Sequence, residues 1–204
     1  MRLVIIDTGV SNSASVGAAV RRATGLEPEL TVDPKAVESA DRVILPGVGS
    51  FAAGMAALER HGLSEVVRER VLDERATLAI CLGMQLLCEA SAESPGVEGL
   101  GVVEGRLERF PPGALRTPHF GWNRVSWSDG DGGGEDGEAY FAHSYRLERA
   151  PEGWRRALCV HGGAFVAALS RGGVLACQFH PELSGAWGAA LIARWARARE
   201  GAAC

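Results

Sequence analysis

The stretch TLAICLGMQLL, residues 77–87, decides the fold and points to a candidate site. Its first apolar residues are typical of a buried parallel strand, and Gly83 with a second apolar run follows Cys81 directly. We interpret the pattern as a strand that turns sharply into a helix at Cys81. Such a turn is strained and crowded, so small residues are needed around it, and Gly83 and Ala79 meet that need.

A cysteine at this turn is expected at the carboxyl edge of the sheet, near the free N–H groups of the following helix. Their partial positive charge favours the thiolate, so Cys81 is a candidate nucleophile. The alternative is a core cysteine, the commonest environment for this residue. Three other cysteines lie in apolar surroundings, the terminal one is expected to be exposed, and none has metal-ligand spacing: Cys88, Cys159, Cys177 and Cys204. We therefore expect no metal and no cofactor.

Length, composition and net charge limit the classes of protein to which this chain can belong. A chain of 204 residues with 47% hydrophobic content suits one domain over residues 1–204. The net charge of −4 argues against nucleic acid and against an anionic membrane as partners. No signal peptide is recognised, and no apolar stretch reaches the ~20 residues of a membrane span. We therefore expect a soluble protein of the cytoplasm.

The first part of the chain alternates between strand and helix patterns. Strands are predicted over residues 2–7, 27–32, 41–47 and 76–80. Helices are predicted over 14–23 with Ser13 as the cap, and over 34–40, 52–62 and 63–75. This alternation predicts a parallel sheet covered by helices on both faces, an α/β fold.

The pattern changes after about residue 100. Residues 101–110, 123–128, 138–148 and 163–180 predict antiparallel strands, with a hairpin turn at Gly172–Gly173. A helix over about 185–199 closes the chain. The acidic, glycine-rich segment 128–138 is interpreted as a mobile surface loop.

A candidate base follows the last predicted strand. His180 ends the apolar run VLACQF and precedes Pro181 and Glu182, so the glutamate can turn back to orient the imidazole. The alternative is a strand-end histidine beside a helix-capping glutamate. Because Cys81 and His180 would each end a strand at the same sheet edge, the pair favours nucleophilic catalysis.

Two motifs together resemble the class I glutamine amidotransferase family: ICLGMQLL (80–87) and QFHPE (178–182). Four further motifs resemble the branch that supplies ammonia to a (β/α)8-barrel synthase of histidine biosynthesis: LPGVGSFAAGM (45–55), GLGVVEGRLERF (99–110), TPHFGWNRV (117–125) and YFAHSY (140–145). The resemblance implies the fold of that family, a central, mostly parallel sheet with flanking helices and additional antiparallel strands in the C-terminal half.

The resemblance also implies roles for individual residues. Cys81 would attack the side-chain amide of glutamine and form a thioester, while His180 moves the proton and Glu182 orients it. The glutamine would be held by side chains, by an oxyanion loop within Pro46–Gly49 and by backbone atoms, from Gly47, Val48, Gly49, Gln85, Glu93, Ser144 and Tyr145. The implied partners are L-glutamine and the barrel synthase, bound as a heterodimer.

The implied interface with the barrel includes Asn12, Phe120, Trp122 and Leu183. We interpret Phe120 and Trp122 as anchors in a proline-led loop, with core packing as the alternative for Trp122.

Some residues depart from the family pattern: Thr8 and Ser11 in the first loop, Ala79 at the turn, and Leu183 after the HPE motif. Most of these departures fall on or near the expected partner face, so they leave a paralogue with another synthase open. A cysteine hydrolase of similar fold and an inactive scaffold subunit are the alternatives from other classes.

Overall fold

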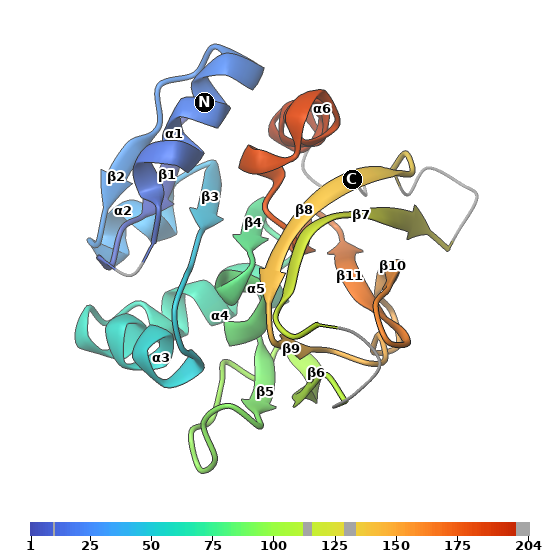
Figure 1. Cartoon of the computed structure of the whole chain (residues 1–204). Coiled ribbons are helices and arrows are strands. Elements are labelled where there is room, and N and C mark those ends of the chain that lie inside the picture. Colours follow the sequence, from blue (N-terminus) through green and yellow to red (C-terminus); the bar gives the residue numbers. More distant parts are fainter. Residues whose placement is uncertain (10, 112–115, 129–133, 199–204) are drawn as a thin grey trace.

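A computed structural model describes residues 1–9, 11–111, 116–128 and 134–198 (Figure 1). Its helices are α1 (Ser13–Thr24), α2 (Pro34–Ser39), α3 (Phe51–Arg60), α4 (Ser64–Leu72), α5 (Leu82–Leu86), the 3-10 turn η1 (Pro181–Leu183) and α6 (Gly185–Arg197). Its strands are β1 (Leu3–Ile6), β2 (Glu29–Thr31), β3 (Arg42–Leu45), β4 (Thr77–Ile80), β5 (Cys88–Ser91), β6 (Val103–Arg109), β7 (His119–Trp127), β8 (Gly137–His143), β9 (Tyr145–Arg146), β10 (Arg155–Val160), β11 (Ala164–Arg171) and β12 (Val174–Cys177).

Within the described residues, nine strands form one sheet in the order β2-β1-β3-β4-β12-β11-β10-β7-β8. The strands from β2 to β12 pair in parallel, and those from β12 to β8 pair antiparallel. Strand β12 joins the two halves, because it is parallel to β4 and antiparallel to β11. The predicted α/β fold and the predicted hairpin at Gly172–Gly173 are confirmed.

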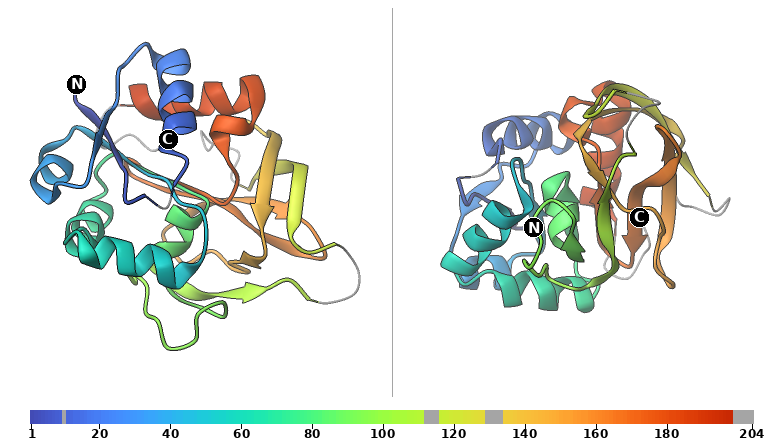
Figure 2. Two further views of the ribbon diagram at one scale, coloured as in Figure 1. Left: turned by 60° about the vertical axis from the view of Figure 1, so that its left-hand side comes forward. Right: turned by 60° about the horizontal axis from the view of Figure 1, so that its bottom comes forward.

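Helices cover both faces of the parallel half, which explains why β1, β3, β4 and β12 are buried throughout. On one face α1 packs against α6, and their buried side chains include Val16, Val20, Ile192 and Trp195. On the other face lie α2 to α5, with Val37, Phe51, Leu58 and Val67 in the core. Figure 2 shows the two helical layers on either side of the sheet.

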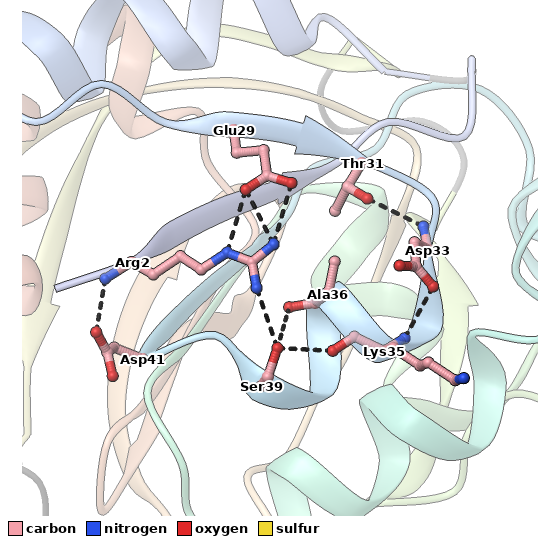
Figure 3. Close-up of polar contacts among 8 residues, drawn as sticks. All are labelled: Arg2, Glu29, Thr31, Asp33, Lys35, Ala36, Ser39 and Asp41. Carbon is pink, nitrogen blue, oxygen red and sulfur yellow. Dashed lines mark hydrogen bonds and ion pairs between the residues drawn. The ribbon is translucent and has the colours of Figure 1, made fainter.

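Polar side chains fix the amino-terminal end of the sheet. Figure 3 shows the Arg2 guanidinium between the Glu29 carboxylate, at 3.0 Å, and the Ser39 hydroxyl, at 3.1 Å. The Arg2 backbone N–H donates to Asp41 at 2.6 Å, and Asp33 caps α2 through the Lys35 N–H. The Arg2 contacts tie β1, β2 and the end of α2 together where the strands begin, while the Asp33 cap fixes the start of α2 just after β2 ends.

Three local predictions need correction. The cap of α1 is Asn12, whose side chain accepts from the Ser15 N–H at 3.3 Å, and Ser13 is the first helical residue. The proline-led segment that carries Phe120 and Trp122 is strand β7 rather than a loop, because it pairs with β8 along its length. The predicted loop 128–138 ends in β8 at Gly137, while its residues 129–133, like Cys204, lie outside the described residues.

Among the described residues, no helix is both long and apolar enough to cross a membrane.

Candidate active site

A pocket of about 400 Å³ opens at the carboxyl ends of the parallel strands. Most of the predicted site residues line it, from segments far apart in the sequence. The lining comprises Val48, Gly49, Cys81, Leu82, Gln85, Glu93, Pro118, Phe120, Ala142, His143, Ser144, Tyr145 and His180. Two predicted residues lie just behind the lining: Gly47 packs against Leu82, and Glu182 contacts His180.

Cys81 occupies the predicted strained turn between β4 and α5. Its φ is 53° and its ψ is −108°, a left-handed conformation that is rare outside glycine. The Cys81 N–H donates to the Cys177 carbonyl at 2.7 Å, which continues the β4–β12 ladder to the turn itself. The neighbouring Gly83 is required by packing, since a Cβ there would lie 2.0 Å from the Leu45 carbonyl oxygen. The sequence interpretation of the turn is therefore confirmed.

The surroundings of the thiol differ from the expectation in two respects. Cys81 is only 7% exposed, so it lies at the bottom of the pocket rather than on an open edge. The helix after it, α5, has only five residues, because the chain enters β5 at Cys88. A helix this short has a small macrodipole, so His180 rather than the helix provides the main positive charge beside the sulfur.

His180 is held by Glu182, as the sequence suggested, and also by the backbone of β8. Its Nδ1 lies 2.9 Å from Glu182 Oε1, and its backbone N–H donates to the Tyr140 carbonyl. Burial disfavours the charged imidazolium, but hydrogen bonds and charge interactions with Cys81 and Glu182 outweigh it and raise the pKa of His180 to about 10. An imidazolium beside a cysteine favours the nucleophilic thiolate.

The Glu182 side chain is buried in its contact with His180. Its side chain is 4% exposed in the turn η1, where Pro181 directs the chain back toward the sheet. Its second oxygen, Oε2, is buried and has no hydrogen-bond partner in the part of the chain that the structure describes. His180 is therefore the group that holds the carboxylate.

Gln85 lies on α5, one turn beyond Cys81, and its side chain is fixed by two acceptors. Gln85 Nε2 donates to the Tyr145 carbonyl at 3.2 Å and to Gln178 Oε1 at 3.0 Å. Gln178 is fully buried, and its Nε2 lies 3.8 Å from Cys81 Sγ. A polar chain thus connects the thiol, through Gln178 and Gln85, to the backbone at Tyr145.

Glu93 closes the pocket on the side of α3. Its Oε2 accepts from the Phe51 N–H at 2.6 Å, where the free amides of the helix attract an anion. The following Ser94 accepts from the Ala52 N–H at 3.2 Å, which fixes the segment on the same helix end. A carboxylate held in this way suits an ammonium group of a small ligand.

The segment after β3 forms the wall opposite His180. Gly47 lies close against α5, since a Cβ there would meet Leu82 Cβ at 2.9 Å. Gly49 has φ +97°, and Val48 between the two glycines is 44% exposed. Glycines on both sides give the Val48 peptide the freedom to reorient its N–H toward the pocket.

Of the predicted interface residues, Phe120 lines the pocket, and Leu183 lines a separate hollow beside η1. Phe120 and Trp122 are 70% and 57% exposed and share the outer face of β7, with Tyr140 between their rings. Core packing of Trp122, the alternative, is therefore wrong. Leu183 is 43% exposed in η1, and Asn12 is exposed at the start of α1.

Some site residues were not predicted. Gln178 and His143 contribute buried polar atoms, and Leu82, Pro118 and Ala142 contribute lining. Gln178 lies two residues before His180, and His143 directly precedes Ser144, so both are parts of motifs whose neighbours were singled out. No periodicity or spacing distinguishes them from core polar residues.

Comparison with known proteins supports the same chemistry. The model of the family "Glutamine amidotransferase class-I" matches residues 4–196. The chain is 42% identical to imidazole glycerol phosphate synthase subunit HisH of Symbiobacterium thermophilum, over 96% of this chain and 93% of that protein. It is 41% identical to the protein of that name from Escherichia coli K12, over 94% and 97% of the two chains. It is also 37% identical to imidazole glycerol phosphate synthase hisHF of Arabidopsis thaliana, over 95% of this chain but 33% of that longer one.

Solved structures share the fold. A crystal structure of a glutamine amidotransferase superposes with a TM-score of 0.74 at 24% identity, over 94% of this chain and 96% of the other. The structure of PurLQS from Thermotoga maritima gives a TM-score of 0.70 at 18% identity, over 95% and 96% of the two chains. With the family model and the relatives above 40% identity, the conclusion is direct: this chain belongs to the class-I glutamine amidotransferase family.

Proposed function

We propose that the chain is the glutaminase subunit of imidazole glycerol phosphate synthase, and that it passes ammonia to a (β/α)8-barrel synthase subunit in histidine biosynthesis. Relatives that bear this subunit name and match nearly the whole chain at 41–42% identity support the assignment. The chain would work in the cytoplasm, as one half of a heterodimer.

The proposed reaction begins with attack by Cys81 Sγ on the side-chain amide carbon of glutamine, which forms a tetrahedral oxyanion. Backbone N–H groups of Leu82, which follows the nucleophile, and of the Gly47–Gly49 segment would stabilise this oxyanion. When the intermediate collapses, the C–N bond breaks and His180 gives its proton to the departing nitrogen, which leaves as ammonia. The product at this stage is a thioester on Cys81.

Hydrolysis of the thioester returns the enzyme to its initial state. His180 accepts a proton from water, the hydroxide attacks the thioester carbon, and the C–S bond breaks to give glutamate and the thiolate. Nδ1 of His180 is engaged by Glu182, so Nε2 is the atom that moves the proton in both half-reactions. Glu93 would bind the α-ammonium of glutamine, and Gln85, Ser144 and Tyr145 its remaining polar groups.

The observation that carries the proposal is the pairing of Cys81, in its strained turn, with the His180–Glu182 pair inside one pocket. The exposed apolar side chains of Phe120, Trp122 and Leu183 support contact with a protein partner. This chain matches only one third of the longer plant protein. That partial match supports a synthase that consists of the glutaminase and a second, different part.

The test is glutamine hydrolysis by Cys81→Ala in complex with the imidazole glycerol phosphate synthase barrel from the same genome. We expect no glutaminase activity in this variant, and normal ring formation when ammonium salt replaces glutamine. Cys159→Ala is the matched control, because Cys159 is buried in β10 away from the pocket, and it should retain activity. Glutaminase activity in Cys81→Ala would refute the thioester route.

Labelling with a glutamine-like electrophile provides an independent test. We expect modification at Cys81 and not at Cys88, Cys159 or Cys177. Burial raises the pKa of both Cys88 and Cys159 to about 12 and keeps them as unreactive thiols. Equal labelling of the core cysteines would contradict the proposal. If the wild-type chain is labelled at Cys81 but no such barrel stimulates it, the chain is a paralogue that serves another synthase.

A further inference from the structure

A row of buried side chains leads from the pocket wall into the hairpin β7–β8. His143 Nδ1 lies 2.9 Å from the Tyr145 carbonyl, and His143 Nε2 lies 3.1 Å from His119 Nδ1. His119 Nε2 lies 3.2 Å from Asn123 Nδ2, which also donates to the Val160 carbonyl at 3.0 Å. His143 and His119 are 5% and 3% exposed, so water does not compete for these contacts.

The position of each ring proton in this row follows from the hydrogen-bonding group next to it. The Tyr145 carbonyl only accepts, so a neutral His143 carries its proton on Nδ1 and accepts at Nε2. His119 must then donate from Nδ1 and accept at Nε2, where the Asn123 amide is a donor. Burial keeps both rings neutral, since desolvation lowers the pKa of His143 to about 3 and that of His119 to about 4.

The rings are also fixed by packing. His119 stacks on His161 and on Phe141, with ring centroids 4.0 and 4.6 Å apart, and His143 lies against Phe110 and Phe165. Among the described residues, no group of three or more His, Cys, Asp or Glu has the arrangement that holds a metal ion. The imidazoles therefore act as hydrogen-bonding groups of defined orientation.

The His143 end of this row of hydrogen-bonded side chains lies at the wall of the substrate pocket. The Tyr145 carbonyl accepts from His143 and from Gln85 Nε2, so one oxygen joins the wall strand to the α5 side of the pocket. Ser144 alone connects β8 to the short strand β9, which begins at Tyr145 and pairs with β6 outside the nine-stranded sheet of the described residues. Pairing with β6 and the Phe110 N–H bond to the Ser144 carbonyl hold this backbone from one side, and the His143 hydrogen bond orients the Tyr145 carbonyl from the other.

We propose that His143 is a positioning residue for glutamine binding, and that His119 supports its ring by donating from Nδ1 to its Nε2. The proposal rests on the proposed function, because its main readout is the KM for glutamine. His143 fixes the Tyr145 peptide and, through it, the Gln85 side chain, while the backbone of Cys81 is held by the β4–β12 ladder and the His180 ring by Glu182. Loss of His143 thus affects the capture of glutamine more than the chemistry on Cys81.

The experiment compares His143→Leu with His143→Asn in the complex with the barrel subunit. An asparagine amide can donate from the place of Nδ1, whereas leucine cannot. We expect His143→Leu to raise the KM for glutamine about tenfold, the effect of one lost hydrogen bond, with kcat changed less than about threefold. His143→Asn should recover most of this loss, and the rate of Cys81 alkylation by iodoacetamide should be unchanged in both variants.

Nitrogen NMR of the wild-type chain tests the tautomers without any variant. We expect His119 and His143 to be neutral with the proton on Nδ1, and His143 to keep this tautomer in His119→Leu, because the Tyr145 carbonyl still only accepts. An Nε2–H tautomer of His143 in the wild-type chain would overturn the proposal, as would equal KM values for the wild type and His143→Leu, or equal losses in His143→Leu and His143→Asn. If the wild-type complex has no glutaminase activity, the proposed function fails instead, and the NMR result still decides the hydrogen-bond row.

Discussion

Replacing Gly83 with alanine tests whether the turn at Cys81 depends on its close packing against β3. The new Cβ would lie 2.0 Å from the Leu45 carbonyl oxygen and 3.0 Å from its carbon. To reach even 3.0 Å from the oxygen, the start of α5 must move away from β3 by about 1 Å. Because both partners are backbone, no side chain can rotate to relieve the contact. We expect the free energy of unfolding to fall by about 3 kcal/mol or more, the upper end of what overpacking costs.

Urea denaturation of Gly83→Ala beside Gly17→Ala measures this effect against a matched control. Gly17 lies inside α1, and the nearest atom to its new Cβ would be 3.7 Å away, an ordinary contact. Alanine there should stabilise the protein by about 0.5–1 kcal/mol through helix propensity. Glutamine hydrolysis by Gly83→Ala should also fall sharply, since Leu82 moves with it. A loss below about 1 kcal/mol at Gly83 would refute the packing argument.

Three further predictions concern the site. Glu182→Gln should lower kcat for glutamine hydrolysis at least about a hundredfold, since His180 loses the charge that orients it, and a loss below tenfold in steady-state assays would contradict this role. Because burial lowers the pKa of His143, the unfolded chain binds the proton more tightly than the native state does. The free energy of unfolding should therefore fall by about 1.4 kcal/mol per pH unit as the pH falls below 6.5. Urea titrations of His143→Asn should show a correspondingly shallower pH dependence. Alanine at Phe120 or Trp122 should weaken barrel binding by about 2 kcal/mol in calorimetry and leave stability of the free chain within about 0.5 kcal/mol, and unchanged binding would exclude the predicted interface.

The sequence was most informative where one residue type has few structural uses. Cys81 between an apolar run and Gly83 predicts the strained turn, because only a small residue fits against the neighbouring strand. Pro181 fixes the direction in which the chain leaves His180, so the contact with Glu182 could be anticipated. Parallel pairing of β4 with β12 brings the two strand ends together, although the sequence pattern predicted antiparallel strands for residues 163–180, and of the two pairings of β12 only that with β11 is antiparallel.

Other features depend on long-range pairing that local patterns do not contain. The segment around Phe120 and Trp122 resembles a loop because Pro118 and Gly121 interrupt it, yet pairing with β8 makes it a strand. The cap of α1 was misassigned by one residue, since Asn12 and Ser13 are equally good capping types. Gln178 and His143 were missed because their roles depend on partners that come close only in the folded chain.

The pairing of β4 with β12 has a consequence for which substitutions this protein can accept during evolution. The nucleophile and its base are held at the ends of two adjacent buried strands in fixed register, from Thr77 opposite Val174 to Ile80 opposite Cys177. The residues expected to meet a partner, such as Asn12, Trp122 and Leu183, lie outside these two strands. Substitution at that outer surface can therefore change which synthase the chain binds, while the paired strands keep the geometry of the nucleophile and its base.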